Sequence, residues 1–409
     1  MRILYLSQSS QLGGAERSLL DFLASLRLNQ PEWSLHLVVP NAGPLVAEAE
    51  TLKVSTSIVK LPAALGRLGD SGAGGNSGRQ VGTAELLART VRALFSIRSY
   101  LGELRSTIAK VAPDLIHANG FKMDILGVWA KPTQLPVVWH IHDYTSSRPV
   151  MARLLRLHAR SCAGAIANSN SVADDLREVC GDGLRVKTIY NAVNLESFSP
   201  LGPIADLDQA AGLAPAPLGT IKIGLVAAMA RWKGHDVFLR AISKIPHELP
   251  IRAYIIGGRL YQTDGSQYAI DELRDLALRL GVTDRVAFTG FIADSAAAMR
   301  ALDVVVHAST QPEPFGLVIA EAMALAKPVV VAYAGGVSEV INDGLDALSH
   351  PPGQAEILAS QIVQLAAHPE LRAKLGSAAR ATAERRFDRM RLGAEVTSAY
   401  ADLGAVAIR

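Results

Sequence analysis

The chain has 409 residues, of which 49% are hydrophobic and 5% aromatic, and its formal net charge is +3. This length is sufficient for two α/β domains with separate hydrophobic cores. No apolar run reaches the roughly 18 residues that cross a bilayer, so we expect a cytoplasmic protein, or one bound peripherally at the inner face of a membrane. The two cysteines, Cys162 and Cys180, lie in no metal-binding motif and give no disulfide framework.

The positive charge is concentrated between residues 86 and 160, where 11 basic residues accompany 4 acidic ones. Leucines between the arginines make two basic stretches amphipathic, as expected of helices on an anionic membrane surface. Solvated arginines on the outer face of core helices explain the same pattern equally well. Nucleic acid is not an expected partner, since no recognition motif occurs. The arginines concerned are Arg89, Arg92, Arg98 and Arg105 in one stretch, and Arg148, Arg153, Arg156 and Arg160 in the other.

Short apolar strands alternate with helical segments in both halves of the chain, which predicts two parallel sheets flanked by helices. We therefore expect domains at residues 1–195 and 196–385, followed by a terminal helix at 386–409. Residues 199–219, rich in Pro, Gly and Ala, mark the linker region. The active site is expected in the cleft between the domains, at the carboxyl ends of the strands. Predicted strands lie at 3–7, 35–40, 115–118, 137–141 and 165–168, and then at 221–227, 251–257, 286–289, 304–308 and 329–332.

A glycine-rich stretch at residues 66–82 holds seven glycines in 17 residues. Two interpretations are open: a mobile loop that folds over an acceptor, or a disordered insertion.

Two glutamates eight positions apart, Glu313 and Glu321, bracket a loop-to-helix junction that follows an apolar strand. Pro312 and Pro314 prevent regular structure around the first carboxylate, and Gly316 lets the backbone approach a ligand closely. A helix can therefore begin near residue 317.

The first amides of that helix, on Gly316, Leu317 and Val318, are unpaired donors at the positive end of the helix dipole, where they can bind phosphate oxygens. Glu321 lies about one turn in, where a carboxylate can accept hydrogen bonds from the diol of a ribose. Glu313, before the helix, can face a sugar. The segment thus predicts a site for a sugar attached to a diphosphate.

This segment resembles the retaining glycosyltransferases of family 4, whose signature is two glutamates separated by seven residues in a Glu-Pro-Phe-Gly context that here includes Phe315. The resemblance covers nearly the whole chain and is weakest at residues 44–111. It implies an α/β GT-B fold, with two Rossmann-like domains facing across a cleft, an acceptor-binding amino-terminal domain and a nucleotide-sugar-binding carboxyl-terminal one. It also implies that the terminal helix crosses back to the amino-terminal domain.

Further segments match the family residue by residue. Gly13 and Gly14 follow the first strand like the family's double-glycine loop, which lets amides approach the donor's phosphate or the reacting sugar. His142 matches a histidine that contacts the transferred hexose, whereas His140 does not match.

Lys233 stands where the family places its phosphate-binding lysine, after the first strand of the second half. Relatives usually carry an arginine five residues before it, where this chain has Ala228, so Arg231 is the cation expected to reach the diphosphate instead. Gly290 belongs to a stretch that resembles the family segment beside the nucleotide base.

The resemblance implies a retaining transfer of a hexose from a UDP or GDP sugar to a hydroxyl acceptor, such as a lipid-linked saccharide in polysaccharide biosynthesis, with no metal or other cofactor. A nucleotide-sugar epimerase or phosphorylase on a similar scaffold, and a non-catalytic nucleotide-sugar-binding relative, remain alternatives. A dehydrogenase and a serine hydrolase are disfavoured, because neither a GxGxxG nor a GxSxG motif occurs.

Overall fold

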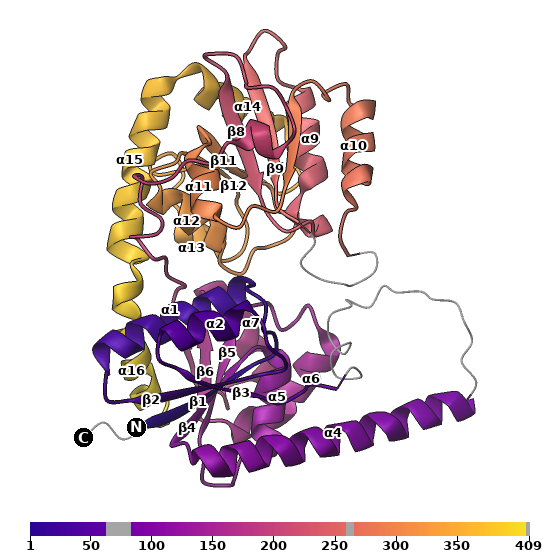
Figure 1. Ribbon diagram of the computed structural model, residues 1–409, viewed down its shortest axis with the longest axis vertical. Helices are drawn as coiled ribbons and strands as arrows, with labels where there is room; N and C mark the ends of the chain where they lie inside the picture. Colours follow the sequence, from indigo (N-terminus) through magenta and orange to yellow (C-terminus); the bar gives the residue numbers. More distant parts are fainter. Residues whose placement is uncertain (63–82, 259–265, 406–409) are drawn as a thin grey trace. The chain divides into compact units, whose positions relative to one another are not determined.

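The computed structural model describes residues 1–62, 83–258 and 266–405, with the backbone alone at 83–95. The chain forms two compact units, an N-terminal unit of Met1–Asn191 with Arg389–Arg409 and a C-terminal unit of Ala192–Asp388. Each unit is built on its own parallel sheet with helices on both faces (Figure 1). The predicted α/β architecture is thereby confirmed, while the roles assigned to the two domains stay predictions.

The N-terminal unit contains a seven-stranded sheet in the order β3-β2-β1-β4-β5-β6-β7, and all its pairings are parallel. Its central strands are largely apolar because helices cover them on both sides, and His117, Asn119 and His140 are buried polar exceptions. The strands are β1 (Arg2–Ser7), β2 (Ser34–Val39), β3 (Ser55–Ile58), β4 (Leu115–Asn119), β5 (Val137–Ile141), β6 (Gly164–Ala167) and β7 (Val186–Thr188).

Two layers of helices cover this sheet. The helices α1, α2 and α16 are neighbours on one face, whereas α4, α5, α6 and α7 follow one another on the other. The last helix, α16, comes from the far end of the chain and packs on α1, and the Tyr400 hydroxyl lies 3.4 Å from that of Tyr5. The bounds are α1 (Gly14–Asn29), α2 (Pro44–Thr51), α4 (Thr83–Val111), α5 (Phe121–Ala130), α6 (Pro149–His158) with the 3-10 turn η1 (Ala159–Ser161), α7 (Asn170–Cys180), and η3 (Arg389–Arg391) before α16 (Leu392–Asp402).

The C-terminal unit contains a six-stranded parallel sheet in the order β10-β9-β8-β11-β12-β13. Helices α9, α10 and α14 cover one face, and α12 and α15 pack together on the other. The strands are β8 (Ile221–Val226), β9 (Ile251–Ile256), β10 (Val286–Gly290), β11 (Val304–His307), β12 (Val329–Ala332) and β13 (Leu348–His350). The helices are α8 (Leu207–Ala210), η2 (Arg231–Lys233), α9 (His235–Ser243), α10 (Ile270–Arg279), α11 (Ser295–Arg300), α12 (Leu317–Ala324), α13 (Val337–Val340), α14 (Ala355–Ala367) and α15 (Pro369–Arg386).

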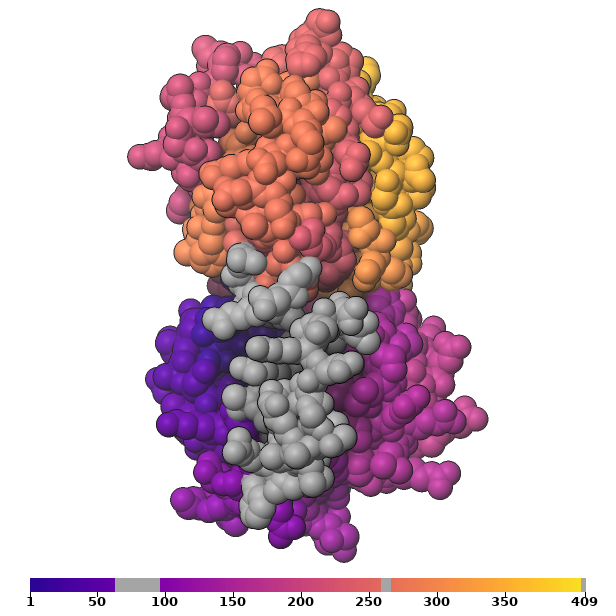
Figure 2. Space-filling view, turned by 90° about the vertical axis from the view of Figure 1, so that its right-hand side faces the viewer, coloured from indigo at the N-terminus to yellow at the C-terminus, as the bar shows by residue number. Residues whose placement is uncertain are grey.

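The segment expected to be the linker, residues 199–219, is attached to the C-terminal unit. Asp208 of α8 is buried and accepts hydrogen bonds from the Tyr254 hydroxyl at 2.6 Å and from Arg252 at 2.7 Å. Arg300 donates to the carbonyl oxygen of Ser199 at 2.8 Å. In Figure 2 this part of the chain is the pink segment at the upper left. The unit boundary accordingly falls before this segment, at residues 191 and 192.

The glycine-rich stretch at residues 66–82 lies outside the described residues. The predicted basic stretches correspond to α4 and α6. Over residues 1–62, 83–258 and 266–405, none of the helices has the length and hydropathy that a bilayer-spanning segment requires.

In each sheet the strand order reverses at one point, between β1 and β4 in the N-terminal unit and between β8 and β11 in the C-terminal unit. In open α/β sheets, ligands bind beyond the carboxyl ends of the strands at such switch points. Gly13 and Gly14 follow β1, and Lys233 follows β8. Glu313 follows β11. The fold therefore brings these predicted site residues to positions where α/β proteins bind ligands.

Close packing after β8 requires a glycine at position 234. Gly234 has φ +72°, and a Cβ atom there would lie 1.8 Å from the carbonyl oxygen of Ala308. Gly281, after α10, has a similar φ of +68° but open space around its Cβ position. We expect Gly234→Ala to lower the free energy of unfolding of the C-terminal unit by more than about 3 kcal/mol, because the backbone must shift in addition to adopting a strained conformation.

Gly281→Ala is the matched control and should cost only about 1 kcal/mol, the conformational penalty alone. Urea denaturation followed by circular dichroism measures both. Equal losses for the two variants would show that the contact with Ala308 does not constrain the loop.

Candidate functional site

The loop after β11 is held at the carboxyl end of the second sheet by backbone hydrogen bonds on both sides of Glu313. The Glu313 amide donates to the carbonyl oxygen of Ala334 at 3.2 Å, and its own carbonyl oxygen accepts from the Gly336 amide at 2.8 Å. This pairing joins the loop to the segment that follows β12. The backbone position of Glu313 is therefore set before its side chain makes any contact.

The Glu313 side chain is buried and surrounded by polar groups. Its Oε2 atom lies 2.7 Å from Lys233 Nζ, 3.1 Å from His307 Nε2 and 3.1 Å from Ser309 Oγ. Burial by itself raises the pKa of Glu313, but the charge of Lys233 and the hydrogen bond from His307 outweigh it and hold the pKa well below its usual range. Glu313 is thus a carboxylate at neutral pH, paired with a largely buried ammonium group.

Lys233 is the last residue of η2, the short turn that follows β8. Its ammonium group also lies 3.9 Å from the centre of the Trp232 ring, within the range of a cation–π interaction. The Thr310 amide donates to the carbonyl oxygen of Trp232 at 2.7 Å and so links η2 to the loop after β11. These contacts orient Lys233 toward Glu313.

Arg231, at the other end of η2, has different partners. Its guanidinium lies 2.8 Å from Glu272 of α10 and 4.5 Å from the centre of the Tyr268 ring. The Arg231 and Glu272 side chains are 44% and 49% exposed, so this pair is far more solvated than that of Lys233 and Glu313. The role predicted for Arg231 at a diphosphate stays a prediction.

The helix α12 begins where the sequence predicted it. Gly316 has φ +88°, and a Cβ atom there would lie 2.7 Å from Ile319 Cδ1. Its carbonyl oxygen accepts hydrogen bonds from the amides of Ile319 and Ala320. The amides of Leu317 and Val318 come earlier, in the first turn, where helix amides have no acceptor within the helix. Glu321 is buried one turn further along.

Phe315 and Gly290 are two further residues that the sequence predicts to bind the donor. Phe315 is buried and packs edge-on against Phe387, with the ring centres 5.7 Å apart. Gly290 ends β10, the edge strand, and β9 separates β10 from β8. The structure thus brings Lys233 and Glu313 together at the start of α12, but Gly290 lies two strands away from β8.

In the N-terminal unit, His142 follows β5 and meets the carboxyl end of β4. His142 Nε2 lies 2.7 Å from Asn119 Oδ1, and the Asn119 amide nitrogen donates to the carbonyl oxygen of Ala15 at 3.4 Å. That second bond defines the orientation of the Asn119 amide, so His142 carries its proton on Nε2. Burial lowers the pKa of His142 to about 3, so the ring is neutral, and its buried Nδ1 has no hydrogen-bond partner among the described residues.

Gly13 and Gly14 stand at the start of α1, close in sequence to Ala15. Gly13 is the N-cap, and the Cβ position of Gly14 has no atom within 4 Å, so the backbone there is open to approach. Asn119 joins this helix start to His142, as described above, but sequence reasoning did not identify it. The only available signal was a polar residue at a strand end.

A buried chain of polar rings lies behind His142. Its ring centre is 3.9 Å from that of His140, whose Nδ1 lies 3.1 Å from His117 Nε2. His117 Nδ1 in turn lies 2.8 Å from the Tyr400 hydroxyl on α16. Burial lowers the pKa of His117 to about 3, so this chain is neutral and works by hydrogen bonding and packing.

Known structures share this fold over the full length of the chain. HepE from Anabaena, solved in complex with UDP and glucose, has a TM-score of 0.79 and 28% identity, covering 98% of this chain and 99% of that one. Sucrose-phosphate synthase from Thermosynechococcus elongatus is 19% identical with a TM-score of 0.76 and covers both chains fully, which bears on the fold alone. Together with the two parallel-sheet units, these structures define a GT-B fold.

Sequence comparison identifies the family. The model described as Glycosyltransferase Family 4 matches residues 12–197, and that of Glycosyl transferases group 1 matches residues 220–368. D-inositol 3-phosphate glycosyltransferase from Streptomyces bingchenggensis is 33% identical over 242 residues, which are 58% of this chain and 52% of that protein. The chain belongs to the family 4 type of glycosyltransferases, and it spans about half the length of the curated relatives it matches.

Lys233 and Arg231, the two cations of η2, allow a matched test of how much each positive charge contributes to stability. We expect Lys233→Met to lower the free energy of unfolding by about 3–5 kcal/mol, because it leaves the buried Glu313 carboxylate without its counter-ion. Arg231→Met removes the same charge from a solvated pair and should cost only about 0–1 kcal/mol.

Urea denaturation of both variants measures the difference, and adding Glu313→Gln to Lys233→Met should recover part of the loss. Equal small losses in both single variants would mean that Lys233 does not neutralise Glu313.

Proposed function

We propose that this protein is a retaining glycosyltransferase that transfers a hexose from a nucleoside-diphosphate sugar to a hydroxyl acceptor. The observation that carries the proposal is the buried pair of Lys233 and Glu313, held at the switch point between β8 and β11 and at the start of α12. A UDP sugar is the first donor to test, because the related HepE structures contain UDP and UDP-glucose. The alternative GDP donor has no comparable support.

The proposed donor site uses helix amides and one buried cation for the diphosphate. The amides of Leu317 and Val318 lie at the positive end of α12. The Lys233 ammonium has three donor hydrogens, so it can keep Glu313 and bind a phosphate oxygen as well. Glu321 is assigned to the ribose and Glu313 to the hexose. Arg231 is a second proposed cation. Its bonds to Glu272 use one of its two terminal nitrogens, and the guanidinium has five donor hydrogens in all.

The proposed reaction breaks the bond between the sugar's anomeric carbon and the diphosphate oxygen. Negative charge then grows on the leaving diphosphate, where Lys233 and the first amides of α12 stabilise it. The acceptor oxygen bonds to the anomeric carbon on the same face, and its proton passes to the leaving phosphate. Retention of configuration follows from this same-face attack, and no protein nucleophile is needed.

The N-terminal unit is assigned the other contacts to the substrate. His142 is neutral, and its buried Nδ1 has no hydrogen-bond partner among the described residues, so a sugar hydroxyl that reaches the ring would find an acceptor there. The open space at Gly14, next to the N-cap Gly13, lets amides at the start of α1 approach the donor's phosphate or the sugar. Asn119 is assigned a positioning role, since it orients the His142 ring.

A lipid-linked acceptor and peripheral contact with an anionic membrane are part of the proposal. On α6, Val150 and Leu157 are 65% and 73% exposed, and arginines lie between them. A helix that exposes both apolar and basic residues suits a membrane surface. The likeness to D-inositol 3-phosphate glycosyltransferases also makes a phosphorylated polyol an acceptor to test.

A second candidate is a relative that binds a nucleotide sugar without transferring it. It is favoured by Ala228, which stands where relatives carry an arginine, and by the pairing of Arg231 with Glu272. An epimerase on the same scaffold would release no nucleoside diphosphate. A coupled assay for released UDP in the presence of acceptor therefore separates the transferase from both alternatives. A changed configuration in the recovered donor sugar then separates the epimerase from the binding protein.

Calorimetric titration with UDP, GDP and ADP tests the donor site directly. We expect UDP to bind with micromolar affinity and to be preferred over the other two, with the heat of binding lost in Glu321→Ala. Glu356→Ala, which removes an exposed carboxylate from α14, is the matched control. Absence of binding by all three nucleotides would refute the donor site.

Steady-state kinetics tests the individual roles. We expect Glu321→Ala mainly to raise the KM for the donor, since it removes a binding contact. Lys233→Ala and His142→Ala should mainly lower kcat, by about 100-fold for Lys233, because they act as the bond breaks. Circular dichroism at the assay temperature must show that each variant is folded. Wild-type kinetics in all three folded variants would contradict the assignment.

A further inference from the structure

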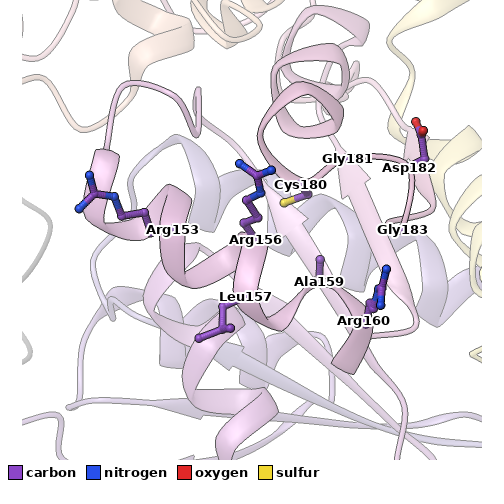
Figure 3. A pocket seen from close by; sticks show the side chains of 9 residues that line it. All are labelled: Arg153, Arg156, Leu157, Ala159, Arg160, Cys180, Gly181, Asp182 and Gly183. Carbon is purple, nitrogen blue, oxygen red and sulfur yellow. The ribbon is translucent and has the colours of Figure 1, made fainter.

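A basic pocket opens on the N-terminal unit between α6 with η1 and the end of α7. Its volume is about 720 Å³. Its lining includes the side chains of Arg153, Arg156, Leu157, Arg160, Cys180 and Asp182, together with the backbone at Gly183. Figure 3 shows Arg156 beside Cys180, with Arg153 at one end and Arg160 at the other, near Gly183.

The arginines of this pocket have no counter-ion among the described residues. Arg153, Arg156 and Arg160 make no ion pair or side-chain hydrogen bond with any residue that the structure describes. Their neighbours Arg148 and Arg177, in contrast, pair with Asp143 at 2.8 Å and with Asp174 at 2.7 Å. The pocket thus contains arginines of this surface that pair with no acidic side chain in the part of the chain that the structure describes.

Nearby carboxylates do not change this balance. Asp182 is the one acidic side chain among the lining residues, against three arginines. Asp175, whose charge adds to the effect of burial in raising the pKa of Cys180, already accepts hydrogen bonds from the amides of Thr145 and Ser146 at 2.6 and 3.1 Å. The lining therefore has a net positive charge.

The spacing of the arginines places them on one side of α6 and η1. They are three and four positions apart, so they are neighbours along one face, where like charges repel one another. Arg160 packs beside Gly183, where a Cβ atom would lie 3.6 Å from Arg160 Nε, so the absence of a side chain keeps this end open. A bound anion would offset the repulsion, and a guanidinium matches the geometry of phosphate oxygens.

We propose that this pocket is a phosphate-binding site that takes the phosphate group of an anionic lipid headgroup or of a soluble phosphate ester. The lipid source is favoured by Leu157, which lines the pocket and is 73% exposed, and by Val150 at 65% on the same helix. Both side chains can contact acyl chains beside a bound headgroup. The inference deepens the proposed membrane contact and does not depend on sugar transfer.

The test uses the full-length protein without nucleotide, so failure of the donor site does not affect it. Two probes are compared: glycerol phosphate in calorimetry, and co-sedimentation with phosphatidylcholine vesicles with or without phosphatidylglycerol. For the variant Arg156→Gln/Arg160→Gln we expect binding to anionic vesicles to weaken about 30-fold, since each basic residue near such a surface contributes about fivefold. The control Arg240→Gln/Arg279→Gln removes the same charge from α9 and α10 and should change binding less than about twofold.

Two further variants separate a shaped pocket from diffuse charge. Gly183→Leu fills the end of the pocket beside Arg160 without changing the net charge, and it should weaken binding as the double arginine variant does. Asp182→Asn removes the lining carboxylate and should strengthen binding.

The outcomes are distinct. Losses with both probes in the pocket variants support a site open to either source, and losses with vesicles alone assign it to lipid. Loss of glycerol phosphate binding with unchanged vesicle binding supports the site and assigns it to a soluble ester. Equal losses in the pocket and control variants, or unchanged binding in Gly183→Leu, would overturn the proposal.

Discussion

The C-terminal unit depends on the neutralisation of one buried carboxylate. Glu313 is removed from water, and a charge there is costly unless a cation and hydrogen-bond donors accompany it. Lys233 supplies the charge, and His307 and Ser309 supply further polar contacts. Three connections must therefore meet at one place, those after β8, β11 and β12. The same arrangement holds an ammonium group near a helix start, and in the proposed reaction this positive charge stabilises the leaving diphosphate.

Much of this arrangement could be predicted from the sequence because its signals are local. Short apolar strands separated by helical segments indicated two parallel sheets, and the prolines and Gly316 indicated where α12 begins. The sequence placed Lys233 and Glu313 after two apolar strands, and the observed strand order, with β8 beside β11, brings the ends of those strands to one edge of the sheet. The functional roles of these residues stay predictions.

Other features could not be predicted because their partners are distant in the sequence. The pairing of Arg231 with Glu272 spans 41 positions, and that of His117 with Tyr400 spans 283. Nothing local distinguishes Asn119 from any polar residue at a strand end, although it orients His142. Glycine and proline determine backbone shape within a few residues, whereas side-chain partners depend on how whole elements pack.

The C-terminal unit is a single continuous stretch of chain, whereas the N-terminal unit is closed by α16 from beyond it. During synthesis, all of the C-terminal unit leaves the ribosome before α16 does, and domains generally fold as they emerge. Until α16 has been made, α1 lacks its packing partner and His117 lacks the Tyr400 hydroxyl. The first half of this protein to be translated is thus the last to be completed, and a chaperone has the longest access to its open face.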